Sequence, residues 1–128
     1  MSCARAKIKL TACEGATFKQ KFVWKTGDPA TAVDMTGYTG VCHIREKITD
    51  EDTVFELVND TGVVIEDQAV TPGGYYMYIS ADDMEGACAR HKERRLVYDL
   101  RLTAPDGSVR LQQYGDFNIE PAVTRTWT

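Results

Sequence analysis

The stretch LVYDLRLTAPDGSVRLQQYGDFNI, residues 96–119, decides the fold of this chain. Its first part has apolar residues at every second position from Leu96 to Leu102. Such alternation is typical of a strand with one buried and one solvated face. In the turn that follows, Pro105 presets φ and Asp106-Gly107 tolerates positive φ, so a hairpin is predicted. We expect its two arms to be the longest strands of the protein.

The second arm of the hairpin keeps its apolar residues at odd positions. These residues are predicted to face the core, and they are Val109, Leu111, Phe117 and Ile119. Gly115 interrupts the arm. A glycine inside a strand marks either a bulge or a close approach of another backbone segment, and both alternatives stay open here.

Alternation with a period of two continues through the rest of the chain. It is found in residues 7–10, 18–25, 42–45, 55–57 and 75–79, and turn residues separate the runs at 26–29, 60–62 and 72–74. About eight short strands with this spacing predict an all-β domain built as an antiparallel β-sandwich. A small barrel is the alternative.

One segment breaks the alternation and predicts a helix. Ser80 stands in the N-cap position, and Asp82 and Asp83 follow in what would be the first turn. Gly86 limits the helix to about two turns. We therefore predict one short helix near Ser80 to Ala87.

Length and composition describe one globular domain, residues 1–128, with loose ends near 1–5 and 122–128. The formal net charge of −4 argues against nucleic acid or an anionic membrane as the main partner. No apolar run has the length of an export signal or of a spanning helix. We therefore expect a protein that is made in a cytoplasm.

Few residues suggest chemistry. Cys42-His43 and Cys88-x-x-His91 could be combined on paper into a zinc site, but neighbours on a strand point to opposite faces. We expect Cys42 to be a buried thiol beside a surface imidazole. No spacing of a nucleophile and its base and no phosphate-binding loop is recognisable. The sequence therefore predicts a protein that is not an enzyme and has no metal and no cofactor.

Two charged runs have ordinary structural explanations. The acidic run Asp50-Glu51-Asp52 lacks the ligand spacing of a calcium loop and is predicted to be a solvated hairpin tip. The basic run Arg90-His91-Lys92-Glu93-Arg94-Arg95 is predicted to be a polar connection. A patch for nucleic acid or an acidic partner is the alternative for the basic run.

Three aromatic residues are candidates for binding a partner. Tyr76 and Tyr78 fall on the side of their strand opposite the apolar residues, where tyrosine is either an ordinary strand former or an interface anchor. Trp127 lies in a polar tail, and a tail tryptophan is suited to docking on a neighbouring chain. The predicted partner-binding residues are Tyr76, Tyr78, Arg125 and Trp127.

Three segments carry a family resemblance, and they are Tyr98-Asp99-Leu100-Arg101-Leu102-Thr103, Pro105-Asp106-Gly107-Ser108-Val109 and Pro121-Ala122-Val123-Thr124-Arg125. Together they resemble a recurrent ending of small phage and prophage proteins. Further matches are residues 15–18, 33–38 and 79–82. These proteins are similar to the N-terminal domain of baseplate upper proteins. The resemblance implies an immunoglobulin-like fold and a role in anchoring receptor-binding parts to a virion.

The expected function follows from this resemblance. We expect a virion structural protein of a bacteriophage, an adaptor at the tail or neck that anchors fibres or other tail components. It would be present as a ring or in multiple copies and would bind other virion proteins, with neither nucleic acid nor membrane as a partner. A capsid decoration protein and a carbohydrate-binding module for host glycans are the alternatives.

The four cysteines are predicted to be free thiols. Cys3, Cys13, Cys42 and Cys88 match no secreted disulfide framework, and a chain without an export signal meets reducing conditions. Alkylation of the unfolded chain without a reductant, followed by measurement of the intact mass, should therefore add four alkyl groups to the chain. Two additions, or none, would contradict this prediction.

Overall fold

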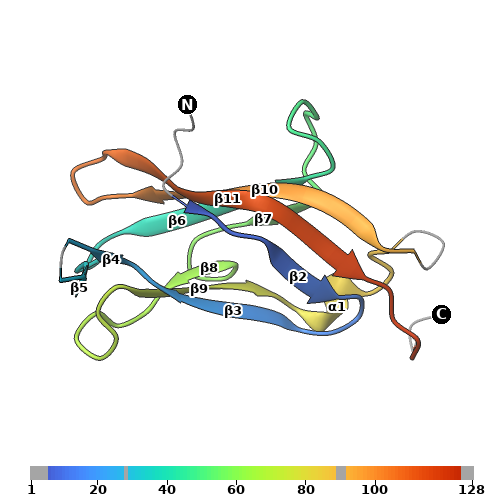
Figure 1. Cartoon of the computed structure of the whole chain (residues 1–128), viewed down its shortest axis with the longest axis horizontal. Coiled ribbons are helices and arrows are strands. Elements are labelled where there is room, and N and C mark those ends of the chain that lie inside the picture. Colours follow the sequence, from blue (N-terminus) through green and yellow to red (C-terminus); the bar gives the residue numbers. More distant parts are fainter. Residues whose placement is uncertain (1–5, 28, 89–91, 125–128) are drawn as a thin grey trace.

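The computed structural model describes residues 6–27, 29–88 and 92–124, and Figure 1 shows strands in two layers. Strands make up 50% of the described residues and helix 3%, which confirms a mostly β domain with one short helix. The described elements are β1 (Ala6–Lys7), β2 (Leu10–Cys13), β3 (Phe18–Val23), β4 (Lys25–Thr26), β5 (Thr31–Ala32), β6 (Thr39–Arg45), β7 (Phe55–Leu57), β8 (Val63–Ile65), β9 (Gly74–Ile79), α1 (Ala81–Met84), β10 (Arg94–Thr103) and β11 (Val109–Glu120).

The upper layer in Figure 1 is a six-stranded sheet with the predicted hairpin at its centre. β10 pairs antiparallel with β11 on one side and with β6 on the other. β7 follows β6 at one edge, and β1 and β2 both pair with β11 at the other edge. The lower layer is a three-stranded sheet in the order β3, β9, β8, and β4 and β5 form a separate small hairpin.

The six-stranded sheet is mixed, so the expected purely antiparallel arrangement is wrong. β1 and β2 run parallel to β11. Alternation of apolar residues indicates which side of a strand is buried, but it carries no information about the direction of the neighbouring strand. The direction follows from the chain path here, because residues 6–13 run along the edge of β11 before the chain crosses to the other sheet as β3.

Gly115 allows the first strands to lie close against β11. A Cβ atom at Gly115 would be 2.5 Å from the carbonyl oxygen of Ile8, and the φ of this glycine is +152°. The Ile8 N–H donates to the Tyr114 carbonyl oxygen at 2.8 Å, which holds the two backbones together. Of the two alternatives for Gly115, the close backbone approach is therefore the observed one.

β11 does contain a bulge, but at another residue. The register with β10 shifts after Leu100, and Gln112 is the extra residue. A bulge of one residue exchanges the two sides of a strand. The odd-numbered residues after the bulge are buried as predicted, whereas the prediction is wrong for Val109, which is 61% exposed, and for Leu111, which faces outward.

Aromatic side chains and one amide join the two sheets. The rings of Phe18 and Phe117 meet edge to face with their centroids 5.1 Å apart. The buried Gln113 side chain accepts a hydrogen bond from the Tyr75 hydroxyl at 2.6 Å and donates one to the Tyr98 hydroxyl oxygen at 3.1 Å. Burial raises the pKa of both tyrosines to about 12. The polar side chains of Gln113, Tyr75 and Tyr98 are thus hydrogen-bonded to one another within the core.

The predicted helix is shorter than expected and is capped as expected. Ser80 Oγ accepts a hydrogen bond from the Asp83 N–H at 3.2 Å.

Beyond the helix, the buried Glu14 carboxylate accepts hydrogen bonds from the N–H groups of Cys88 at 2.9 Å and of Ala122 at 3.1 Å. The backbone at Ala122 is therefore tied to the body of the domain, so the expected loose end does not begin at this residue.

The described cysteines agree with the sequence prediction. Cys13, Cys42 and Cys88 are free thiols, and Cys3 lies outside the described residues. Cys42 is fully buried, and the side chain of His43 beside it is 38% exposed. Burial raises the pKa of the Cys42 thiol.

Replacing Gly115 by alanine should separate the first strands from β11. We expect Gly115→Ala to lower the free energy of unfolding by about 2–4 kcal/mol, because the new Cβ collides with backbone that is itself paired. Gly107→Ala is the matched control, since Gly107 has a φ of +88° but no atom within 4 Å of its added Cβ. The control should lose only about 1 kcal/mol. Equal losses in chemical denaturation would contradict the close approach.

Candidate functional site

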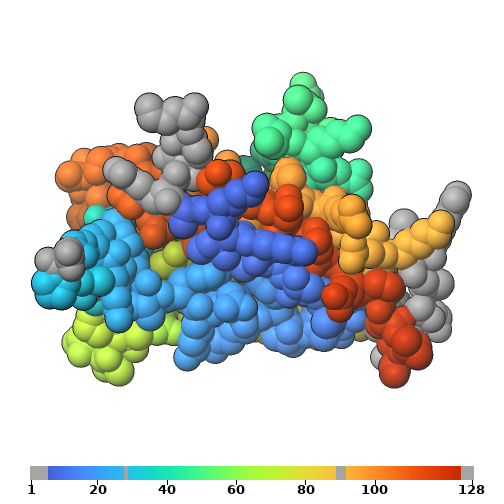
Figure 2. Space-filling model, viewed as in Figure 1, coloured from blue at the N-terminus to red at the C-terminus, as the bar shows by residue number. Residues whose placement is uncertain are grey.

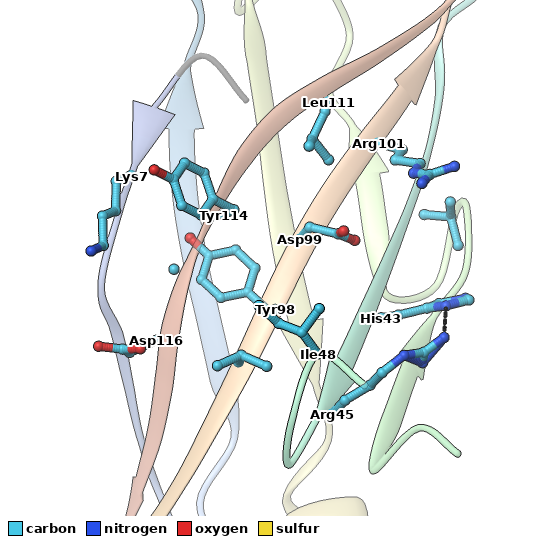
Figure 3. Close-up of a pocket in the computed structure, with 13 residues that line it drawn as sticks. Lys7, His43, Arg45, Ile48, Tyr98, Asp99, Arg101, Leu111, Tyr114 and Asp116 are labelled. Atoms are coloured by element: carbon cyan, nitrogen blue, oxygen red, sulfur yellow. Dashed lines mark hydrogen bonds between the residues drawn. The ribbon is translucent and has the colours of Figure 1, made fainter. Parts of the chain in front are cut away.

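The outer face of the six-stranded sheet contains a hollow of about 670 Å³, drawn in Figure 3. Residues that alternate with the core line it, because neighbours on a strand point to opposite faces. They are Val41, His43 and Arg45 from β6, Val97, Asp99 and Arg101 from β10, and Leu111, Tyr114 and Asp116 from β11. Lys7 of β1 and Ile48 of the loop after β6 also border the hollow.

The hollow combines apolar side chains with charges of both signs. Figure 3 shows Asp99 near the middle, with Lys7, Tyr114 and Asp116 on one side and His43, Arg45 and Arg101 on the other. The side chains of Lys7, Asp99 and Arg101 form no ion pair with another residue that the structure describes. These charges are therefore available to a partner.

The Arg45 guanidinium is incompletely satisfied. Its Nη2 atom lies 3.3 Å from Nδ1 of His43, and Nε2 of His43 lies 3.7 Å from the Glu56 carboxylate. Its Nη1 atom is buried and has no hydrogen-bond partner among the described residues. A buried unpaired donor costs about 1–3 kcal/mol of stability. Buried polar groups without a hydrogen-bond partner are found at functional sites, where the protein is less stable than it could be.

The loop of residues 46–54 joins β6 to β7 and stands away from the body of the domain in Figures 1 and 2. Ile48 in this loop is 86% exposed. The acidic run at 50–52 is the tip of an antiparallel hairpin, as predicted. At the base of the loop, Glu46 accepts a hydrogen bond from Arg94 Nη2 at 2.7 Å. The loop is thus fixed at its base and presents an apolar residue beside three acids.

The described part of the basic run is engaged within the protein. Arg94 donates to the Ala87 carbonyl oxygen at 3.0 Å in addition to its pair with Glu46. Arg95 pairs with Glu93 at 3.0 Å. Residues 89–91 lie outside the described residues. Residues 92–93 thus form part of a polar connection, whereas Arg94 and Arg95 already belong to β10.

The described residues, 6–27, 29–88 and 92–124, contain neither a metal-binding cluster nor a membrane-spanning helix. Nowhere in this part of the chain do three or more His, Cys, Asp or Glu side chains gather so that they could hold a metal ion. His91, which the zinc alternative needs, lies outside it. No helix within it is long and apolar enough to cross a membrane. The expected absence of a metal, a cofactor and catalysis stays a prediction.

The residues predicted to bind a partner do not line the hollow. Tyr76 and Tyr78 are half-buried on the outer face of the three-stranded sheet, on the other side of the molecule. The Nζ atom of Lys19 lies 4.5 Å from the centroid of the Tyr76 ring, so a cation lies over one face of this ring. Arg125 and Trp127 lie outside the described residues.

Sequence reasoning misses the hollow because the alternating pattern assigns its residues to solvent. A usable signal was present, since Val41 and Val97 are apolar and share the outward side with His43 and Asp99. Two apolar residues on a wet side indicate a surface that a partner covers. The position of Ile48 carried no such signal, because it depends on the conformation of the loop.

Two comparisons with known proteins give no match. No model of a protein family matches this chain, and no curated protein is significantly similar to it.

The unpaired Arg45 donor predicts a stabilising substitution. Arg45→Met keeps the apolar stem and removes the buried N–H groups, so the free energy of unfolding should rise by about 1 kcal/mol. Arg101→Met on the neighbouring strand is the matched control and should change stability by less than about 0.5 kcal/mol, because Arg101 is exposed. Both are measured by urea denaturation. A loss of stability in Arg45→Met would show that the guanidinium is satisfied.

Proposed function

We propose that this chain is an immunoglobulin-like structural component of a bacteriophage particle, an adaptor at the tail or neck that binds other virion proteins. The observation that carries the proposal is the outer face of the six-stranded sheet. It combines a hollow, apolar side chains such as Val97 and Leu111, and charges without a described partner. Such a mixture at the centre of a surface is suited to binding another protein.

The strand order supports the immunoglobulin-like part of the proposal. In that fold the sheet containing strands G, F and C faces a sheet containing B, E and D, and variable-type domains add a C′ strand beside C. The order β11, β10, β6, β7 opposite β3, β9, β8 corresponds to G, F, C, C′ opposite B, E, D. The parallel strands β1 and β2 occupy the free edge beside β11.

The resemblance to phage and prophage proteins supports the virion part of the proposal. Two of its segments, residues 98–103 and 105–109, belong to the hairpin of β10 and β11. Asp99 and Arg101 of the first segment also line the hollow. The residues that carry the resemblance are therefore partly residues of the candidate binding surface.

Particles from the source strain provide the test of this proposal. The chain should be present in purified particles in a fixed ratio to the other structural proteins. Tyr114→Ala should reduce its incorporation about 10-fold or more, since a central tyrosine in an interface contributes at least about 2 kcal/mol. Tyr78→Ala is the matched control, because Tyr78 is also half-buried and faces outward from a strand, but on the other sheet.

Each outcome of this experiment has a definite meaning. Density for the chain in a ring at the tail or neck would support the adaptor. Particles that lack the chain would refute a structural role. Loss of incorporation with Tyr78→Ala but not with Tyr114→Ala would refute the assignment of the binding surface to the six-stranded sheet.

A further inference from the structure

We propose that the hollow binds residues 46–54 of a second copy of the same chain, in a dimer with two-fold symmetry. The proposal rests on the proposed function insofar as the outer face of the six-stranded sheet is taken to bind protein. It goes further by naming the partner and the two surfaces that meet.

The loop of residues 46–54 has the features of an inserting segment. It stands clear of the domain in Figure 2, and its Ile48 side chain is 86% exposed. Four acidic residues and one lysine give the loop a formal charge of −3, from −4 and +1. Glu46 is already paired with Arg94, so the acids at 50–52 remain for another partner. An exposed isoleucine beside acids that form no ion pair with a described residue requires an apolar and cationic complement.

The hollow offers this complement. Its lining includes the apolar residues Val97 and Leu111 and the cations Lys7, Arg45 and Arg101. These three exceed the two acids of the lining, Asp99 and Asp116, although the whole chain is negative. A volume of about 670 Å³ is large enough to take several side chains of a loop. The apolar lining and the excess of cations in the hollow therefore both favour an acidic segment that carries an apolar side chain.

Position on the molecule favours a second copy over an unrelated segment. The loop borders the hollow of its own chain, since Ile48 is among the lining residues. A two-fold axis beside the loop brings each loop over the hollow of the other chain, so both contacts form at once. A self-complementary surface of this kind needs both charge signs on the same face, and this face has them.

Sedimentation equilibrium of the full chain provides the first test. The chain should show a mass of 14.3 kDa on dilution and approach twice this value as its concentration rises. Ile48→Glu should shift the dissociation constant about 10-fold or more toward the monomer, because it places a carboxylate where the apolar side chain inserts. A wild-type chain that stays monomeric over the whole concentration range would overturn the proposal.

Charge reversal gives the sharper test. Arg101→Glu makes the hollow more acidic, and the double variant Glu51→Lys/Asp52→Lys makes the loop basic, so each variant alone should be monomeric. Mixed in equal amounts they should form a heterodimer, since each loop then meets a hollow of opposite charge. Lys25→Glu and Glu85→Lys are control reversals at exposed positions away from this face and should dimerise like the wild type.

The outcomes separate this proposal from the proposed function. Dimers that persist in the single variants would place the contact elsewhere and overturn the proposal. Variants that keep the wild-type circular dichroism spectrum but do not recover the dimer on mixing would overturn the pairing of loop and hollow. A monomeric wild-type chain that still enters particles in a Tyr114-dependent manner would refute only the dimer, and the proposed function would stand.

Discussion

The antiparallel pairing of β10 with β11 is the constraint on which the rest of the structure depends. It runs from Arg94 opposite Ile119 to Thr103 opposite Val109 and is closed by a four-residue turn. Of the other strands of the six-stranded sheet, β6, β1 and β2 pair with one of these two strands, and β7 pairs with β6. The hairpin also has two functional sides, because its inward residues form the core and its outward residues form the floor of the hollow. The core and the proposed binding surface are therefore arranged on the same strands.

The polar groups of the core and those of the outer face of the six-stranded sheet differ in how completely they are paired. Inside, Gln113 is hydrogen-bonded to two tyrosines, and Glu14 receives two backbone N–H groups. Outside, Arg45 retains an unpaired buried N–H group, and Lys7 and Arg101 have no ion pair with a described residue. A domain of this size has only a small net stability, so an unsatisfied surface persists where binding compensates for it. This contrast is the physical basis for placing the partner on the outer face.

Much of the fold could be predicted from the sequence, and the candidate site could not. Local chemistry determined the Asp106-Gly107 turn and the Ser80 cap, and both were correctly predicted. The parallel direction of β1 and β2 and the bulge at Gln112 depend on contacts between distant residues, which alternation does not report. The same limit applies to the hollow, because it requires three strands and a loop to be placed together. Tyr76 was assigned to the correct side of its strand, but its cover by Lys19 is again a tertiary contact.

Hydroxyl-radical footprinting of the chain, free and within purified particles, tests the central claim most directly. The claim is that partners bind the outer face of the six-stranded sheet. Assembly should then reduce labelling at Ile48, Leu111 and Tyr114, while labelling at Tyr78 on the opposite face stays the same. Protection confined to Tyr76 and Tyr78, with the hollow still labelled as in the free chain, would contradict the account.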